Sequence, residues 1–491
     1  MSSEVKIKGK KRSLKVNAAL NVIKQCCVII FPLITFPYIS RILGNDGFGK
    51  YSFSLSVLSY FRLFAGLGVS TYAIREGAKI RDDRIKLEKF SSQIFTINVL
   101  STLVSMTAMI IIVMAVPKLS EYASYIYVLS IGVWLTTIGV DWINSIYEDY
   151  FYITVRYIIF EAIAIVFMFL FVRSRDDVLV YCLVATFAGY GGNIANVFYV
   201  RRYAHVHLTI HMDFKRHIVP LLVLLANSFA ITIYVNSDIA MLGFYYNDAV
   251  VGTYSFVSKL YDILKQLINA IVVVSIPRAA YYLKNERDKY NIELKRITNA
   301  LTMAALPVIV GLSMMSKEII LFVGGKQYLA GNTPLKILSF AIVFAIYSSL
   351  FTNCVLIVNN KEKYCLISTL ISAALNIGIN FALFPYIGAT GAAITTLLAE
   401  GTNCILQMWY GKKIFKFSIP YLVRNNYQCF IGAVSIFAIC LLVNNFLTGV
   451  IWRLFCAILI SIIVYVGILW SMKYEPFIEV LNVVTKKFRH K

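Results

Sequence analysis

Long apolar stretches separated by short polar segments follow one another along nearly the whole chain. Each stretch approaches the roughly 20 residues that an α-helix needs to cross a bilayer core of about 30 Å. The runs are continuous, as in SMTAMIIIVMAV and IVFMFLFV, whereas the strands of a membrane barrel alternate. The pattern predicts about fourteen spanning helices, near residues 14–40, 50–74, 90–116, 123–146, 153–172, 178–200, 218–242, 250–280, 297–323, 335–359, 365–384, 389–410, 427–447 and 452–472.

The composition agrees with a chain whose solvent is lipid. Of its 491 residues, 59% are hydrophobic and 15% are charged, and the mean hydropathy is +0.72. The sequence therefore predicts an all-α polytopic membrane protein. The formal net charge of +22 would suggest a nucleic-acid partner in a soluble protein. Here we expect no nucleic acid, because the positions of the charges matter more than their sum.

The basic residues are concentrated in alternate loops and predict the orientation of the chain. Lys and Arg favour the side of the N-terminus by roughly four to one, as in REGAKIRDDRIKLEK and LKNERDKYNIELKR. Such loops normally face the cytoplasm, so both termini are expected there. The first apolar segment follows KIKGKKRSLK without a small-residue cleavage site, and we expect it to be retained as the first helix.

An internal repeat relates the two halves of the chain. ILGNDGFGKYSF and MLGFYYNDAVVGTYSF share Leu-Gly, a short polar loop and Gly-x-Tyr-Ser-Phe. Aligning Gly49 on Gly252 places Arg62 opposite Lys265. Chance similarity between apolar helices is the alternative, but many transporters are built from two such halves. We therefore expect two pseudo-symmetric six-helix lobes and an additional helix pair with a basic tail, residues 1–217, 218–416 and 417–491.

Polar residues inside the first two spans are candidates for a functional site. A charge at the bilayer centre costs roughly 2.5–3.5 kcal/mol on insertion scales, so it normally faces a partner or a wet cavity. Asn17, Asn21 and Lys24 follow one another at i, i+4 and i+7, which places them on one face of the first helix. Arg62 lies deep in the second helix.

A second polar stripe crosses the eighth span. Lys259, Asp262, Gln266 and Asn269 fall at i, i+3, i+7 and i+10, with Lys265 beside them. Asp262 either neutralises one of the two lysines or carries a proton. The sequence leaves both roles open.

Cations outnumber acids among these intramembrane positions. Asp238, near the end of the seventh helix, is a supporting residue that could equally be solvated at the interface, and the same alternative applies to Asp141, Glu161 and Glu400. The expected cavity would attract an anionic substrate such as a phosphate. Its predicted binding cations are Lys24, Arg62, Lys259 and Lys265, supported by Asn17, Asn21, Asp238, Asp262, Gln266 and Asn269.

Several chemistries are not supported by the sequence. There is no G-x-x-x-x-G-K-[ST] loop for ATP, and GYGGN fits a turn or close helix packing. His205, His207 and His211 could hold zinc, but a basic rim facing lipid headgroups is the simpler interpretation, so no metal site is predicted. We expect no cofactor, and leave open a coupling ion, H⁺ or Na⁺. A membrane-bound polysaccharide polymerase or ligase would need an extracytoplasmic catalytic loop, and those loops are short.

The segment NIGINFALFPYIGATGAAITTLLAEG resembles the polysaccharide transporter family of the multidrug/oligosaccharidyl-lipid/polysaccharide exporter superfamily. PLITFPYISRILGNDGFGKYSF, NSDIAMLGF and GTYSFVSKLYDIL are similar to the same family. One departure follows Asp141 and Trp142, where Ile143, Asn144 and Ser145 stand in place of a Gln-Gly pair. The residues that carry the first match are Asn376, Asn380, Pro385, Gly388, Gly391, Ala392, Ala393 and Glu400.

The resemblance implies an alternating-access flippase of the bacterial cytoplasmic membrane. Its substrate would be undecaprenyl-diphosphate-linked oligosaccharide for O-antigen, capsule or exopolysaccharide, and polysaccharide polymerase machinery is a further candidate partner beside the lipid bilayer. An exporter of drugs or of the peptidoglycan lipid precursor is the nearest alternative, although a drug exporter would favour carboxylates. We expect Arg62 and Lys265 to hold the diphosphate from opposite lobes. The alternative is that Arg62 pairs with a buried acid such as Asp262 and supports folding.

Overall fold

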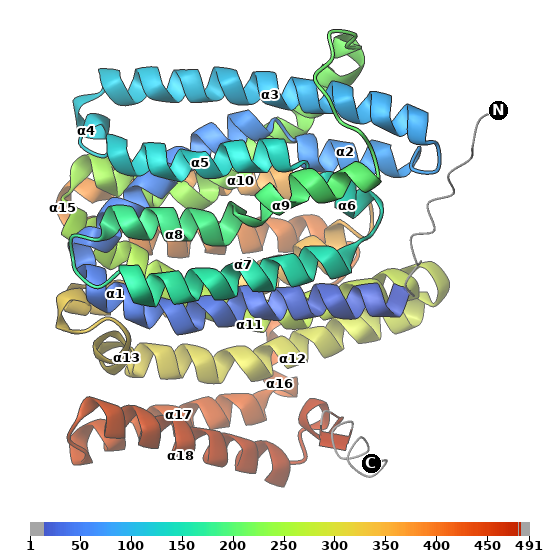
Figure 1. Ribbon diagram of the computed structural model, residues 1–491. Coiled ribbons are helices and arrows are strands. Elements are labelled where there is room, and N and C mark those ends of the chain that lie inside the picture. Colours follow the sequence, from blue (N-terminus) through green and yellow to red (C-terminus); the bar gives the residue numbers. More distant parts are fainter. Residues whose placement is uncertain (1–13, 480, 483–491) are drawn as a thin grey trace. The chain divides into compact units, whose positions relative to one another are not determined.

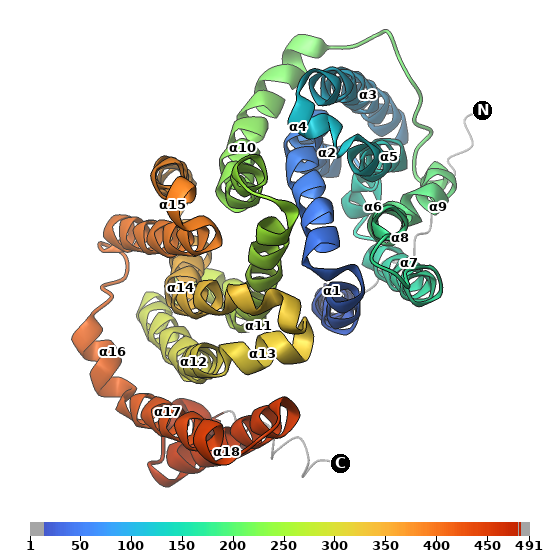
Figure 2. The ribbon, with the colours of Figure 1, turned by 90° about the vertical axis from the view of Figure 1, so that its left-hand side faces the viewer.

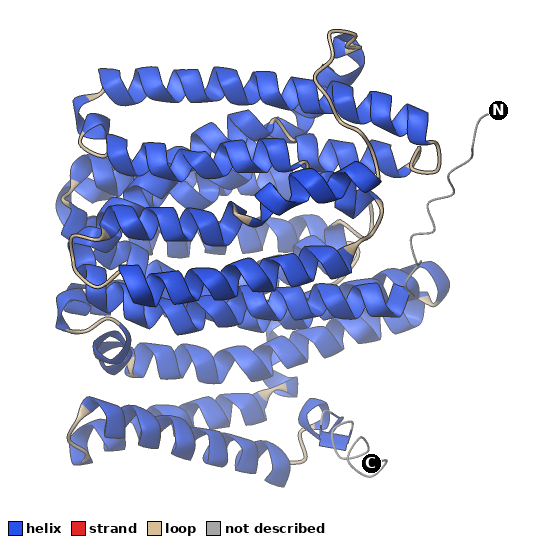
Figure 3. Ribbon diagram, in the orientation of Figure 1, coloured by secondary structure: helices blue, strands red, loops and turns tan. Residues whose placement is uncertain are grey.

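The computed structural model describes residues 14–479 and 481–482, and within them the regular elements are all helices (Figure 3). Eleven of these described helices are long and apolar enough to cross a membrane. Two of the eleven, of 52 and 50 residues, contain a sharp bend and can each cross twice. The shorter Ala123–Gly139 adds one more crossing. The all-α polytopic fold is confirmed, and the helices are consistent with about fourteen spans.

The chain divides into two compact units, Met1–Phe244 and Tyr245–Lys491. In the first unit α1 packs against α3, α5 and α7, and α7 lies beside α8 (Figure 1). The elements of this unit are α1 (Leu14–Gly66), α2 (Val69–Ala78), α3 (Arg84–Ala115), α4 (Pro117–Ser120), α5 (Ala123–Gly139), α6 (Trp142–Ile146), α7 (Tyr150–Phe171), α8 (Val178–Tyr190), α9 (Gly192–Tyr199), the 3₁₀-helix η1 (Val200–Arg202) and α10 (Phe214–Tyr245).

In the second unit α12 packs against α11, α14 and α17, and α17 pairs with α18 (Figure 2). The predicted C-terminal helix pair is therefore part of this unit. Its elements are α11 (Asp248–Asn285), α12 (Arg287–Met314), α13 (Ser316–Val323), the 3₁₀-helix η2 (Lys326–Gly331), α14 (Asn332–Leu350), the π-helix η3 (Phe351–Leu356), α15 (Glu362–Gly411), α16 (Ile419–Asn425), α17 (Tyr427–Phe446) and α18 (Val450–Ser471).

Two glycines allow long helices to bend sharply. Gly44 in α1 has φ 70° and Gly388 in α15 has φ 45°, a left-handed conformation that glycine adopts without a steric penalty. The two arms of α15 run in different directions (Figure 2). A Cβ on Gly388 would also lie 3.2 Å from Cζ of Tyr246. The breaks expected between the first two spans, and between the eleventh and twelfth, are therefore bends rather than extended loops.

The boundary between the units lies one helix later than the expected 217/218 division, because α10 packs on the first unit. His217 Nδ1 is 2.8 Å from the Tyr72 hydroxyl, and its Nε2 is 3.0 Å from Gln93 Oε1. Further along α10, the Asn236 carbonyl accepts a hydrogen bond of 3.0 Å from Ser56. These polar contacts join α10 to α1, α2 and α3.

The Gly-x-Tyr-Ser-Phe repeat makes the same kind of contact in each unit. Phe53 is fully buried, with its ring centre 4.8 Å from that of Tyr122. Phe256, its counterpart in the repeat, is also fully buried, and its ring centre is 4.1 Å from that of Tyr328. Each tyrosine lies between the third and fourth predicted spans of its half. The shared packing gives a structural reason for the repeated motif.

Candidate functional site: a cavity at three helix breaks

Three helix breaks in the first unit border one cavity of about 320 Å³. α1 and α2 are separated at Leu67 and Gly68, which both have positive φ, and α5 ends at Gly139, just before Val140 with φ 40°. The third, milder break is at Gly191 between α8 and α9, where the residue keeps helical backbone angles. Broken helices expose backbone groups, which are tolerated at membrane depth where they line a cavity or are buried in protein. The breaks therefore mark this cavity as the candidate site.

Among the described residues, the charged ones that line the cavity are Lys24, Asp141 and Arg156. Arg156 Nη2 lies 2.6 Å from Asp141 Oδ1, and the Arg156 side chain is only 10% exposed. The Lys24 ammonium lies 6.0 Å from the centre of the Tyr157 ring, also on the cavity wall. Two cations and one carboxylate leave the wall with a net positive charge, which suits an anionic ligand.

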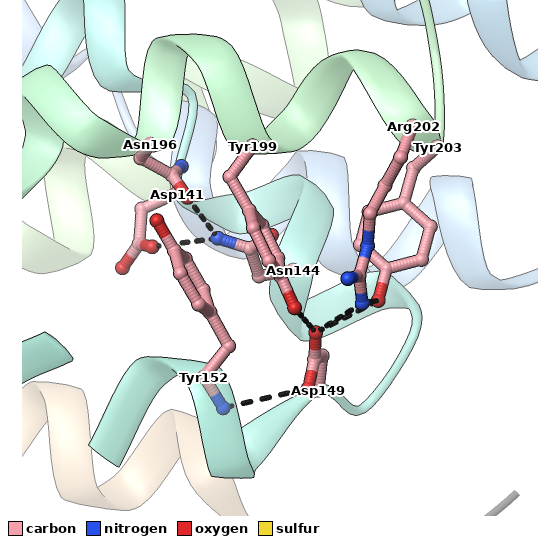
Figure 4. Close-up of polar contacts among 8 residues, drawn as sticks. All are labelled: Asp141, Asn144, Asp149, Tyr152, Asn196, Tyr199, Arg202 and Tyr203. Carbon is pink, nitrogen blue, oxygen red and sulfur yellow. Dashed lines mark hydrogen bonds and ion pairs between the residues drawn. The ribbon is translucent and has the colours of Figure 1, made fainter. Parts of the chain in front are cut away.

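A chain of amides also holds the Asp141 carboxylate (Figure 4). Asn144 Nδ2 donates to Asp141 Oδ1 over 3.1 Å and to Asn196 Oδ1 over 2.6 Å. Asn196 Nδ2 in turn donates to the Gly139 carbonyl over 2.6 Å, at the end of α5. Asn144 is one of the residues that depart from the family pattern, and here it links α6 to α9.

Arg156 is closely packed but incompletely hydrogen-bonded. A Cβ on Gly192 would lie 3.1 Å from Arg156 Cγ, so a residue without a side chain leaves room for the arginine. The guanidinium carbon lies 5.3 Å from the centre of the Tyr152 ring. Arg156 Nη1 is buried and has no hydrogen-bond partner among the described residues. One nitrogen of the guanidinium therefore has hydrogen-bonding capacity that no described residue uses.

Arg62 lies beside the same cavity. Its guanidinium carbon is 4.9 Å from the ring centre of Tyr190, which lines the cavity. Its Nε is buried and has no hydrogen-bond partner within the described part of the chain. The first unit therefore holds two arginines with an unused buried donor. Whether Lys265 shares a site with Lys24 and Arg62 stays a prediction, because Lys265 belongs to the other unit.

A second acid-centred cluster ties the start of α7 to η1, outside the cavity wall (Figure 4). Asp149 Oδ2 accepts hydrogen bonds from the hydroxyls of Tyr199, at 2.6 Å, and Tyr203, at 2.8 Å. Arg202 Nη2 lies 2.8 Å from the same oxygen. Burial, assisted by the bond to Asp149 and opposed by Arg202, raises the pKa of Tyr203 to about 12. The hydroxyl therefore stays protonated and can donate at physiological pH.

In the second unit Lys265 is compensated by two acids. Its Nζ lies 3.1 Å from Asp262 Oδ1 and 3.7 Å from Glu400 Oε1. Glu400 also accepts a hydrogen bond of 3.0 Å from Tyr261 and is only 6% exposed. Of the two roles left open for Asp262, the structure shows the ion pair with Lys265. The interpretation of Glu400 as a solvated interfacial acid is wrong, because α15 buries it against α11.

The remaining predicted residues differ in exposure. Lys259 and Gln266 are exposed, whereas Asn269 accepts a hydrogen bond of 2.5 Å from Ser349 Oγ. Asp238 is only 7% exposed, so its interpretation as a solvated interfacial residue is wrong. The side chains of Asn17 and Asn21 lie outside the described residues. Whether Lys259, Gln266 and Asn269 line a substrate path together stays a prediction.

The loop histidines lie along α3 rather than around a common centre. His207 Nδ1 is 3.4 Å from Ser92 Oγ, and the His205 backbone N–H donates to Glu88 Oε1 over 3.0 Å. Among the described residues no group of three or more His, Cys, Asp or Glu could hold a metal ion. These contacts attach the loop after η1 to the N-terminal part of α3.

Arg156 is not among the residues predicted from the sequence, and Asp141 is predicted only as an acid that could be solvated at the interface. The available signal was a cation a few residues inside the fifth predicted span, together with an acid inside the preceding one. Acids and bases at this depth usually pair. The break at Val140 and the position of α7 bring the two together, and neither feature is visible in an apolar run.

Long apolar helices, broken around a charged cavity, define a polytopic membrane carrier, and comparison with known proteins identifies its family. The family model described as polysaccharide biosynthesis protein matches residues 14–283, more than half of the chain. The chain belongs to this family, which confirms the resemblance. A protein of Escherichia coli K12, provisionally named O-antigen transporter, is 25% identical over 400 residues, 79% of this chain and 94% of its own.

Two further proteins are similar to this chain. A Haloferax volcanii protein, provisionally named low-salt glycan biosynthesis flippase Agl15, is 23% identical over 245 residues, 49% of this chain and 51% of its own. The lipid II flippase MurJ in an inward closed conformation has the same fold, with a TM-score of 0.73, 16% identity and coverage of 94% of this chain and 100% of its own. The chain is a membrane transporter rather than an enzyme, as predicted.

Proposed function

We propose that this protein is a flippase that moves undecaprenyl-diphosphate-linked oligosaccharide across the bacterial cytoplasmic membrane for surface polysaccharide synthesis. The cavity at the three helix breaks carries this proposal, because Lys24 and Arg156 line it and Arg62 lies behind Tyr190. A diphosphate offers several oxygens to these donors, and arginine matches phosphate geometry with its planar fork. The names of the O-antigen transporter and Agl15 support the same substrate class.

The contacts of Lys265 favour a different role for it from the one expected, in which it bound the diphosphate together with Arg62. Asp262 and Glu400 already compensate its charge, whereas Arg62 and Arg156 each have an unused buried donor. We therefore assign the diphosphate to the first unit, and Lys265 to an ion-paired position in the second. Alternating access by the two units would then carry the bound headgroup from one side of the membrane to the other.

Purified protein in proteoliposomes should move a lipid-linked oligosaccharide between leaflets, detected by access of a glycan-modifying reagent. Arg62→Ala should slow this movement by about tenfold or more, and Arg62→Lys by less, because lysine keeps the charge but loses the fork. Arg201→Ala, an exposed arginine of η1, is the matched control and should transport normally. A wild-type protein that moves no lipid-linked oligosaccharide would contradict the function. Normal transport by Arg62→Ala would contradict only the role of Arg62.

We also propose that both termini and the loop of residues 201–217 face the cytoplasm, because the Lys and Arg asymmetry favours that side. Reporter fusions after the loop and at the C-terminus should give cytoplasmic signals, and a fusion within residues 173–177 should give the opposite one. A periplasmic signal from the loop would overturn this orientation.

A further inference from the structure

We infer that Asp141 is an internal counter-ion, which neutralises Arg156 while the cavity is empty and is displaced when a diphosphate binds. The inference rests on the proposed function for the identity of the anion. It assigns to Asp141 a positioning role that opposes binding, rather than a direct contact with the substrate.

The contacts of Arg156 show why its present partner is replaceable. Only Nη2 of the guanidinium meets Asp141, at 2.6 Å, while Nη1 is buried without a hydrogen-bond partner in the described residues. A buried donor without an acceptor costs roughly 1–3 kcal/mol. A phosphate group can accept two parallel N–H bonds from one guanidinium. Binding of the anion would therefore satisfy a donor that the carboxylate leaves unused.

The surroundings of Asp141 show where the displaced carboxylate would be stabilised. Its side chain is 38% exposed, so water can solvate it. Asn144 Nδ2 donates to the same Oδ1 atom, and Asn144 is held in place through Asn196 and the Gly139 carbonyl. The carboxylate would exchange one charged partner for water and keep its amide partner. The hydrogen bonds that hold the segment between α5 and α6 can therefore persist both with and without a bound anion.

The counter-ion would also assist release. A carrier has to bind its substrate firmly enough to capture it and weakly enough to release it. Lys24 on the cavity wall and Arg62 behind Tyr190 add positive charge, and with Arg156 they could hold a diphosphate too tightly for turnover. Because Asp141 stays beside Arg156, it competes for the guanidinium throughout. Removing the carboxylate should strengthen binding and slow transport.

The first unit provides a matched control at Asp149. Asp149 also pairs with an arginine, Arg202, at 2.8 Å. Its side chain is more buried than that of Asp141, 17% against 38% exposed, but neither Asp149 nor Arg202 lines the cavity. If the loss of any carboxylate, or of any Asp–Arg pair, changed anion binding, the substitution of Asp149 would have the same effect as that of Asp141. An effect of the counter-ion would appear at Asp141 alone.

The test measures the binding of inorganic pyrophosphate to the purified full-length protein by calorimetry. Asp141→Asn should bind pyrophosphate about tenfold more tightly than the wild type, because the hydrogen bonds of Arg156 are no longer contested. Arg156→Gln should bind more weakly. The double variant should resemble Arg156→Gln, since the gain requires the arginine. Asp149→Asn should bind like the wild type, and a thermal unfolding scan checks that each variant is folded.

A merely structural role for Asp141 predicts loss of binding, so a gain is diagnostic. The inference is overturned if Asp141→Asn binds no more tightly than the wild type, if the gain persists without Arg156, or if Asp149→Asn shows the same gain. These outcomes are independent of the proposed function, which depends on transport of the lipid-linked oligosaccharide. If the protein does not transport that lipid but Asp141→Asn still binds pyrophosphate more tightly, only the proposed substrate is contradicted. The counter-ion role of Asp141 is then supported.

Discussion

Lys265→Met should destabilise the folded protein by about 3 kcal/mol, the lower end of what is lost when one partner is removed from a buried ion pair. Glu400 is the reason, since its side chain is only 8% exposed and would lose its cation. Asp262, at 39% exposed, can be solvated and should contribute little to this loss. Thermal unfolding in detergent, together with the yield of monodisperse protein, measures the effect.

Two further variants separate the ion pair from other causes. Adding Glu400→Gln to Lys265→Met removes the unpaired charge and should restore most of the stability. Lys259→Met changes an exposed lysine of the same helix, and its unfolding temperature should stay close to that of the wild type. If Lys265→Met instead unfolds normally but abolishes transport, Lys265 binds the substrate, as the repeat with Arg62 first suggested.

Asp149→Ala should destabilise the first unit by about 2–3 kcal/mol, because a charge-assisted hydrogen-bond centre is lost. Asp149 receives the hydroxyls of Tyr199 and Tyr203 as well as Arg202, all on one oxygen atom. Without an acceptor these donors would remain near one another and partly buried. Thermal unfolding is again the measurement.

Asp149→Asn is the conservative partner of this variant. The amide oxygen can still accept from one tyrosine, so we expect about half of the loss. Equal unfolding temperatures for Asp149→Ala and the wild type would show that the stacked rings of Tyr152 and Tyr199, whose planes differ by 3°, hold α7 and α9 together without the acid.

The sequence predicted the spanning helices well because an apolar run of bilayer length has few alternatives in lipid. It did not show that the predicted spans 123–146 and 178–200 are broken, because hydropathy reports the length of an apolar run and not the backbone conformation within it. GYGGN was the exception, because its glycines indicated a turn or close packing, and Gly191 and Gly192 provide both. Helical periodicity, by contrast, cannot reveal a break caused by a single non-glycine residue such as Val140.

The candidate site was harder to predict because charge pairing is a tertiary property. Lys24 and Arg62 were found as isolated cations inside apolar segments, and the structure places them on or beside the cavity. Lys265 had the same sequence signal, yet Glu400, 135 positions away along the chain, compensates it. Arg156 lacked a conspicuous pattern, and its importance depends on Asp141 and on an unused nitrogen. Such features depend on distances between helices.

The length of α5 sets the depth at which the exchange between Asp141 and an anion would occur. Its 17 residues extend about 26 Å, slightly less than the roughly 30 Å of the hydrocarbon core. With the N-terminus of α5 at the outer surface, as the predicted orientation requires, the break at Val140 lies close to the level of the inner headgroups. The phosphates of a lipid in the inner leaflet occupy this level before any movement begins. Arg156 could therefore meet its anion without first drawing that charge into the hydrocarbon, so initial recognition would avoid the main dielectric barrier.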